Sequence, residues 1–215
     1  MTHAVLCAYA RSPFTLAGKG EMAKVRPDDI MTQVVKGLLA KTPLKQGDIE
    51  DLLLGCAFPE GEQGFNMGRM IVLMADLPLT IGGATVNRYC GSSMETVHMA
   101  AGKIATNAGE LFIAAGVESM SRIPMGGFNP LPHPKLYESM PGAYMSMGIT
   151  AENLCTRFKI PRAEQEAFAL KSHQKAAKAN LAQEIGPIVH KNGTTDKDGC
   201  IRADTPLAQT APRAP

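Results

Sequence analysis

The chain has 215 residues, of which 45% are hydrophobic and 20% charged, and its 22 basic and 20 acidic residues leave a formal net charge of +2. A charge this small argues against nucleic acid or an anionic membrane as the principal partner. No apolar run approaches the length of a membrane span, and residues 1–6 lack the basic start and long apolar core of a signal peptide. We therefore expect a cytoplasmic protein.

Five cysteines are spread along the chain without a C-x-x-C pair: Cys7, Cys56, Cys90, Cys155 and Cys200. An odd number of cysteines without a secretion signal indicates reduced thiols rather than a disulfide framework. Structural zinc requires closely spaced cysteine or histidine pairs, and the sequence has none. We expect no metal site, and a role for any single cysteine has to follow from its surroundings.

The first third of the chain alternates between apolar runs and helical patterns. Residues 4–9 predict a short buried strand, and Asp28 is expected to open a helix whose apolar residues recur every fourth position. A second buried strand is predicted at residues 52–57. Asn66 is a suitable cap for the next helix, in which methionine and isoleucine follow helical spacing.

The same alternation continues around Cys90. Residues 84–89 lead in an extended conformation into Cys90, and a helix of small residues follows Gly91 and ends at Gly109. Residues 111–116 predict another strand. Strands that alternate with helices predict a largely parallel sheet with helices on both faces, which is the α/β class.

The composition changes after about residue 120. Residues 121–149 are rich in proline and glycine, and we expect a long irregular segment there. Thr150 is expected to cap a short helix, and Pro161 to start a longer one with lysines on its outer face. Residues 204–215 show no periodicity and predict a frayed or artificial terminus.

Cys90 lies where an extended segment meets a helix. The free N–H groups and the positive end of a helix favour the ionised thiolate, which is the nucleophilic form of cysteine. Attack on a thioester exchanges one sulfur for another, so the thiolate need not be strongly basic. The main-chain N–H of Cys90 is expected to be one of the two or more donors that an oxyanion hole requires. From spacing alone, an inert core thiol at a helix start is the commoner arrangement.

The segment Val86–Met94, VNRYCGSSM, resembles the acyl-enzyme cysteine signature of thiolases. Four further segments resemble other motifs of that family in the same order: Arg11–Phe14, Glu62–Asn66 with Arg69, Ala114–Ser121 and Met147–Asn153. The resemblance spans residues 4 to about 204. It implies the N-terminal β-α-β-α-β half of a thiolase, with an N-terminal domain at residues 1–120 that carries the nucleophilic cysteine. Residues 121–215 would then be part of an inserted covering-loop domain, truncated.

The resemblance also implies a function. A thiolase-type acyltransferase acts on acyl-CoA or 3-ketoacyl-CoA, in thiolysis or Claisen condensation, through an acyl group on the residue that Cys90 matches. Met147 matches a family position near the pantetheine, which implies substrate binding, and a core methionine is the alternative. The coenzyme A thioester is a substrate, and no permanently bound cofactor is expected. Residues 62–66 resemble the degradative enzymes of fatty acid β-oxidation, and the family implies a dimer or another homo-oligomer.

Thiolases complete their chemistry with a second half that supplies a histidine in a G-H-P motif, an asparagine in N-E-A-F and a cysteine in C-x-G. None of these motifs occurs in residues 1–215. General-base steps are typically worth about 10²–10⁴-fold each. We therefore expect slow acylation of Cys90 with little or no turnover. The departure from the family pattern after Asp204 suggests truncation or a shifted reading frame.

Two other interpretations stay open. A decarboxylating ketosynthase-like enzyme has the same fold, but the N-R-x-C-G-S-S context and the long segment after Ser121 argue against it. A non-catalytic remnant that associates with a full-length thiolase belongs to a different class, and exposed sheet edges and apolar helix faces would favour such association. A stable acetyl adduct on Cys90 after incubation with acetyl-CoA would distinguish the first interpretation from the last.

Overall fold

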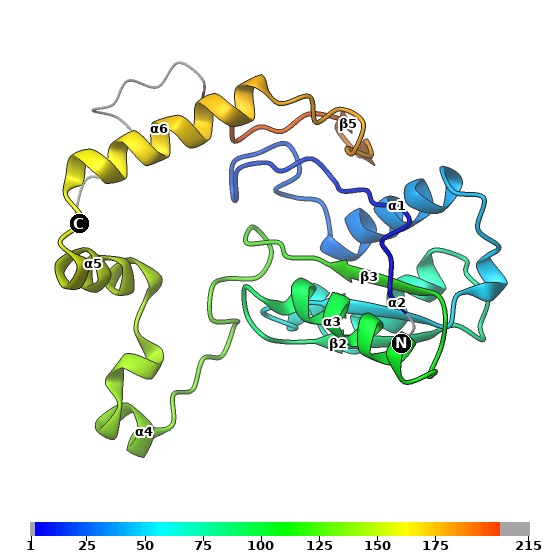
Figure 1. The fold of residues 1–215 in the computed structure, drawn as a ribbon, viewed down its shortest axis with the longest axis horizontal. Coiled ribbons are helices and arrows are strands. Elements are labelled where there is room, and N and C mark those ends of the chain that lie inside the picture. The colour runs from blue at the N-terminus through cyan, green and yellow to red at the C-terminus, as the bar shows by residue number, and fades with distance from the viewer. Residues whose placement is uncertain (1–2, 203–215) are drawn as a thin grey trace. The chain divides into compact units, whose positions relative to one another are not determined.

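The computed structural model describes residues 3–202, and helices and strands alternate over residues 27–116 (Figure 1). These residues form two compact units, the first of residues 3–129 and 181–200 and the second of residues 130–180 with 201 and 202. The predicted functional domains at 1–120 and 121–215 stay a prediction. The predicted frayed terminus from residue 204 lies outside the described residues.

A three-stranded parallel sheet forms the centre of the first unit. Strand β1 (Asp51–Gly55) lies between β2 (Gly82–Val86) and β3 (Phe112–Gly116), and it pairs with both in parallel. The three leucines at positions 52–54 are fully buried, because the central strand is covered on both faces. The predicted α/β class with a parallel sheet is confirmed.

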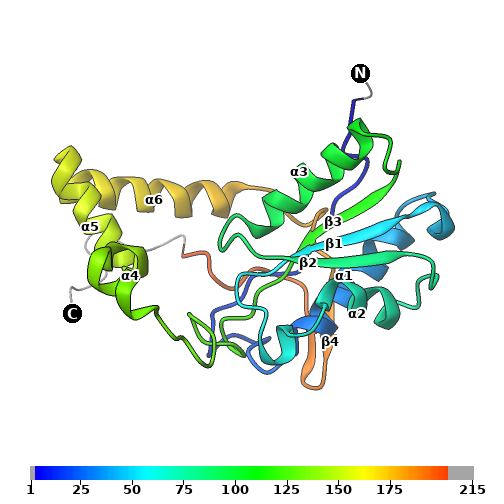
Figure 2. The same ribbon diagram turned by 90° about the horizontal axis from the view of Figure 1, so that it is seen from below.

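Helices cover both faces of this sheet, as predicted. Helix α3 (Ser92–Ala105) packs on one face, while α2 (Met67–Met74) packs on the other with α1 (Pro27–Ala40) beside it (Figure 2). The main hydrophobic core lies on the side of α1 and α2, and its fully buried members include Val35, Leu52, Leu54, Met67, Ile71, Val72 and Ile81.

The predicted helix starts are partly correct. Asn66 caps α2 as expected, because its side-chain oxygen accepts a hydrogen bond from the N–H of Arg69 at 3.4 Å. Helix α1 begins at Pro27 rather than at Asp28, and Arg26 is its N-cap. Proline suits the first helical position, since its missing N–H would have no partner there.

Residues 4–9 do not form the predicted buried strand. They are exposed, Leu6 by 87%, and they line an open groove of about 1600 Å³ whose other walls come from α1, α3 and β3. Strand β1 already has a partner on each edge, and β3 has a partner only on its inner edge among the described residues. An extended apolar segment becomes a strand only when it pairs with such an edge, and this one does not.

A short antiparallel hairpin in the first unit was not predicted. It consists of β4 (Ile188–His190) and β5 (Gly193–Thr195), joined by the two residues Lys191 and Asn192. Gly193 follows with a φ of 132°, in the region that favours glycine. An Asn-Gly pair is a common hairpin signal, so the sequence contained a cue for this turn.

Arg11 joins the start of the chain to the segment that carries this hairpin. Its two terminal nitrogens donate to the two carboxylate oxygens of Asp198, each at 2.8 Å, and its Nε donates to Glu184 at 2.7 Å. Asp198 also accepts a hydrogen bond from the N–H of Phe14 at 2.8 Å. These bonds, that of Arg11 foremost, lower the pKa of the Asp198 carboxyl below its ordinary value.

We expect Asp198→Asn to lower the free energy of unfolding by about 1–3 kcal/mol at pH 7, because it removes a charge-assisted pair. A carboxyl whose pKa is lowered by folding stabilises the protein above its unfolded pKa and loses that effect as pH falls through its folded pKa. The difference in the free energy of unfolding between Asp198→Asn and wild type should therefore shrink below about pH 4. Urea titrations at pH 7 and pH 3 measure it. Asp76→Asn, at an exposed ion pair with Lys36, should change stability by less than about 0.5 kcal/mol.

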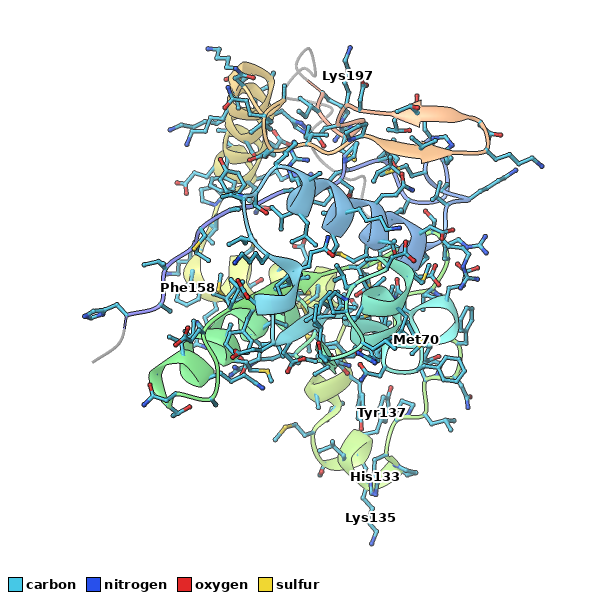
Figure 3. All side chains as sticks on the ribbon, turned by 90° about the vertical axis from the view of Figure 1, so that its right-hand side faces the viewer. Met70, His133, Lys135, Tyr137, Phe158 and Lys197 are labelled. Atoms are coloured by element: carbon cyan, nitrogen blue, oxygen red, sulfur yellow. The ribbon has the colours of Figure 1, made fainter. Side chains whose placement is uncertain are left out.

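The second unit is helical and contains more regular structure than predicted. Residues 121–149, expected to be irregular, include α4 (Pro134–Ser139) and the 3-10 helix η3 (Pro141–Tyr144). His133 caps α4, accepting from the N–H of Leu136 at 3.4 Å, and Figure 3 shows its side chain with those of Lys135 and Tyr137 projecting from this segment.

Two longer helices follow in this unit, α5 (Met147–Phe158) and α6 (Arg162–Lys178). Helix α6 starts directly after Pro161, as predicted. The predicted cap of α5 is wrong, since Ser146 accepts from the N–H of Ile149 while Thr150 lies inside the first turn and donates to the Ser146 carbonyl. Within residues 3–202, no helix has both the length and the apolar character needed to cross a bilayer.

Candidate functional site

Cys90 lies at the carboxyl end of the parallel sheet, between β2 and α3, and it is exposed. In open parallel sheets, ligands bind in the crevice outside the carboxyl ends of the strands. Helix α3 begins at Ser92 with Gly91 as its N-cap, so Cys90 directly precedes the cap. The thiol is therefore accessible from solvent beside the start of a helix.

Two glycines bring the start of α3 against the strand ends. A Cβ atom on Gly55, the last residue of β1, would lie 2.4 Å from the carbonyl carbon of Ser92 and from the nitrogen of Ser93. A Cβ on Gly116, the last residue of β3, would lie 2.4 Å from the Cβ of Ser93. Only glycine permits such approaches. The position of the helix start, and with it Cys90, depends on both residues.

The first turn of α3 offers free hydrogen-bond donors. Within residues 3–202, the N–H groups of Ser93 and Met94 have no acceptor, and Gly91 has no side chain to cap them. Unpaired N–H groups at a helix start and the helix dipole both favour negative charge nearby. These N–H groups are thus suited to stabilise an oxyanion that develops beside Cys90.

The turn that leads into Cys90 is tightly constrained. Tyr89 has a φ of 47°, in the left-handed region that residues other than glycine seldom adopt. The Asn87 side-chain oxygen accepts from the Tyr89 N–H at 2.9 Å, and the Ser92 hydroxyl donates to the Tyr89 carbonyl at 2.6 Å. The same hydroxyl accepts from the N–H of Arg88 at 2.8 Å. Side chains on both sides of Cys90 therefore fix the backbone of this turn.

A buried glutamine lies behind the strand ends, at the end of the 3-10 helix η2 (Gly61–Gln63). The Gln63 side chain is fully buried, and its nitrogen donates to Glu118 at 2.6 Å and to the Phe58 carbonyl at 2.9 Å. Its oxygen accepts from the N–H of Ser119 at 2.7 Å. Buried amides are normally satisfied in this way, and here the bonds connect the ends of two strands.

Cys56 lies beside this glutamine and is 1% exposed, with its sulfur 3.4 Å from the Gln63 side-chain nitrogen. Burial, and then the negative charge of Glu118, raises the pKa of the Cys56 thiol to about 12. The thiolate is the reactive form, so Cys56 is inert near neutral pH. Of these two cysteines that follow strands of the sheet, only Cys90 is a candidate nucleophile.

Met147, the predicted substrate-binding residue, is the first residue of α5 and is 65% exposed. It therefore does not pack in a core, which was the alternative for this methionine. Met147 belongs to the second unit and Cys90 to the first. Its role in substrate binding stays a prediction.

Three residues of the site were not singled out from the sequence: Gln63, Asn87 and Glu118. Asn87 directly follows β2, and Glu118 lies two residues after β3. A polar residue at the end of an apolar strand was the available cue, because the ends of parallel strands meet at one edge of the sheet. Within residues 3–202, no three His, Cys, Asp or Glu side chains are grouped to bind a metal.

Comparison with known proteins places this geometry in context. Residues 4–212 match the family model "Thiolase, N-terminal domain". The chain is 47% identical over 192 residues to a 3-ketoacyl-CoA thiolase of Bacillus subtilis (strain 168), covering 87% of this chain and 49% of that protein. It is 39% identical over 225 residues to a 3-ketoacyl-CoA thiolase of Shewanella sp. (strain ANA-3), covering 100% of this chain and 58% of that protein. The chain thus spans about half the length of these relatives.

Proposed function

The chain belongs to the thiolase family through its N-terminal domain, and from this premise we propose that Cys90 accepts an acyl group from a coenzyme A thioester. The observation that carries the proposal is the exposed Cys90 thiol beside the free N–H groups of α3, within the segment that resembles the family's nucleophile signature. The relatives' names support 3-ketoacyl-CoA as a substrate, and the family resemblance implies acyl-CoA as well.

The proposed step is a thioester exchange. The Cys90 sulfur attacks the carbonyl carbon of the thioester, and the carbonyl oxygen becomes an oxyanion that the N–H groups at the start of α3 can stabilise. The bond between that carbon and the sulfur of coenzyme A then breaks. Cys90 retains the acyl group as a thioester, and the released coenzyme A thiolate takes up the proton that the Cys90 thiol gave up.

We expect one acylation per chain rather than turnover for these 215 residues. The family resemblance assigns the later steps to G-H-P, N-E-A-F and C-x-G motifs, none of which occurs in this sequence. Activation and proton abstraction by such groups are typically worth about 10²–10⁴-fold each. Condensation and thiolysis should therefore be undetectable, while slow acylation is retained.

Incubation with acetyl-CoA should add the mass of one acetyl group to the intact chain, and peptide mapping should locate it on Cys90. Cys90→Ala should abolish the adduct. Cys7→Ala is the matched control, because Cys7 is also an exposed cysteine and lies outside the turn, and this variant should acylate at the wild-type rate. Cys56 should stay unmodified in all samples, since its thiol is buried and protonated. An acetyl group that is absent from Cys90, although iodoacetamide alkylates it, would contradict the proposal.

A second candidate function is association with another copy of the chain or with a full-length thiolase subunit. The observation that favours it is the outer edge of β3, which has no partner strand among the described residues and lines the open groove. Unpaired apolar strand edges promote pairing with other chains. Sedimentation of the purified chain at increasing concentration tests for association.

A further inference from the structure

We infer that Asn87 is a positioning residue for Cys90 and that Gln63 and Glu118 act on the same turn through the backbone of Ala57. This inference rests on the proposed function of Cys90 as an acyl acceptor. None of these three side chains is assigned contact with the substrate. They are inferred to set where the sulfur lies relative to the first turn of α3.

The first link fixes the backbone that follows β1. One Glu118 carboxylate oxygen accepts from the Ala57 N–H at 2.7 Å, and the other accepts from the Gln63 side chain at 2.6 Å. Gln63 also donates to the Phe58 carbonyl at 2.9 Å. Two consecutive residues of this loop are therefore bound to the same pair of side chains. Because Gln63 is fully buried, water does not compete for its bonds.

The second link runs from this loop to the cysteine turn. The Asn87 side-chain nitrogen donates to the Ala57 carbonyl at 3.0 Å, and its oxygen accepts from the Tyr89 N–H at 2.9 Å. Asn87 therefore uses both ends of its amide to connect the end of β1 with the residue before Cys90. The rings of Phe58 and Tyr89 meet edge to face with centroids 6.1 Å apart, which adds a second contact between the same two loops.

The third link is the strained residue itself. Tyr89 has its φ of 47°, and sparsely populated backbone conformations of this kind persist only where the surroundings impose them. Without the Asn87 bond, Tyr89 can relax toward an ordinary conformation, and the next residue moves with it. A misplacement of about 1 Å at a reacting group can lower a rate by about 10²-fold.

The variants that test this inference are graded. Asn87→Ala removes both bonds and should slow acetylation of Cys90 by about tenfold to 10²-fold. The upper figure is the loss expected for a misplacement of about 1 Å. Asn87→Ser can still accept from the Tyr89 N–H but is too short to reach Ala57, so its rate should lie between those of wild type and Asn87→Ala. Glu118→Gln keeps the shape of the side chain but replaces one of its two acceptor oxygens with an NH₂ donor, and it should slow acetylation several-fold.

The measurement is the rate at which Cys90 gains one acetyl group, followed by mass spectrometry on folded protein, beside the urea midpoint of each variant. If Asn87 and Glu118 act on one turn, the effects of Asn87→Ala and Glu118→Gln should not multiply. The double variant should then acetylate at close to the rate of the slower single variant. Gln46→Ala, in the 3-10 helix η1 (Gln46–Asp48) at the opposite end of the sheet, is the control and should acetylate at the wild-type rate.

An Asn87→Ala variant that is folded and acetylates at the wild-type rate would overturn the inference, and so would an Asn87→Ser variant as slow as Asn87→Ala. If Asn87→Ala does not fold, Glu118→Gln decides, and a wild-type rate there rejects the role of the Gln63–Glu118 pair. If wild type itself takes no acetyl group, the proposed function fails. The rate at which iodoacetamide alkylates Cys90 then tests positioning separately. We expect this rate to fall from wild type to Asn87→Ser to Asn87→Ala, and equal rates in all variants would contradict the inference.

Discussion

Gly55→Ala is expected to lower the free energy of unfolding by about 3 kcal/mol, at the upper end of the usual range for overpacking. The added methyl group would lie 2.4 Å from backbone atoms of Ser92 and Ser93, and a helix backbone cannot give way as a flexible side chain can. Relief requires the whole start of α3 to move away from β1. Urea denaturation followed by circular dichroism measures the loss.

Gly102→Ala is the matched control, because Gly102 lies inside the same helix and a Cβ there meets no atom within 4 Å. Alanine in an exposed helix interior should stabilise the chain by about 0.5–1 kcal/mol relative to glycine. The two substitutions are chemically identical and should change the free energy of unfolding in opposite directions. Equal stability of Gly55→Ala and wild type would mean that α3 does not pack on β1 as closely as the structure indicates.

Gly55→Ala should also slow the acetylation of the Cys90 thiol. Since α3 supplies the free N–H groups beside Cys90, a shift of its first turn separates the donors from the sulfur. The folded fraction of Gly55→Ala is therefore expected to acetylate at least about tenfold more slowly than wild type. Gly102→Ala should acetylate at the wild-type rate, because it leaves the start of the helix unchanged.

Leu53→Ala is expected to destabilise the first unit by about 2–5 kcal/mol. Leu53 is the middle residue of the central strand and is fully buried. Its neighbours Leu52 and Leu54 belong to the core on the side of α1 and α2, whereas side chains of a strand alternate, so Leu53 faces the side of α3. Removing its side chain leaves a cavity that the tightly seated helix cannot close.

Leu79→Ala controls for the loss of a leucine as such, since Leu79 is 75% exposed. A surface substitution of this kind should change the free energy of unfolding by less than about 0.5 kcal/mol. The difference between the two urea midpoints isolates the effect of burial. A Leu53→Ala variant as stable as Leu79→Ala would contradict the central position of β1.

Local patterns predicted much of the first unit correctly. The apolar run at residues 52–54 has no polar alternation, so it fits only a strand covered on both faces, and the structure has it there. Asn66 was predicted as a cap because capping requires only an N–H group of the adjacent helical turn, here that of Arg69. Features that depend on a few neighbouring residues are accessible from sequence.

Residues 4–9 show where such patterns fail. Their apolar composition predicts a strand, but a strand needs an edge to pair with, and pairing depends on residues far along the chain. The hairpin at 188–195 was missed for the opposite reason, since its strands are too short to show periodicity. Only its Asn-Gly turn was informative.

For the candidate site, the sequence by itself predicted the candidate nucleophile and its setting: a cysteine between an apolar strand and a helix, within a segment that resembles thiolases. The contacts that hold the turn before Cys90 were decided by tertiary structure. Gln63 ends η2, whereas Asn87 and Glu118 follow β2 and β3, and the three are linked through the loop after β1 because parallel strands end at one edge of the sheet. Hydrogen bonds among residues 55 positions apart leave no periodic signal, because nothing local requires either partner.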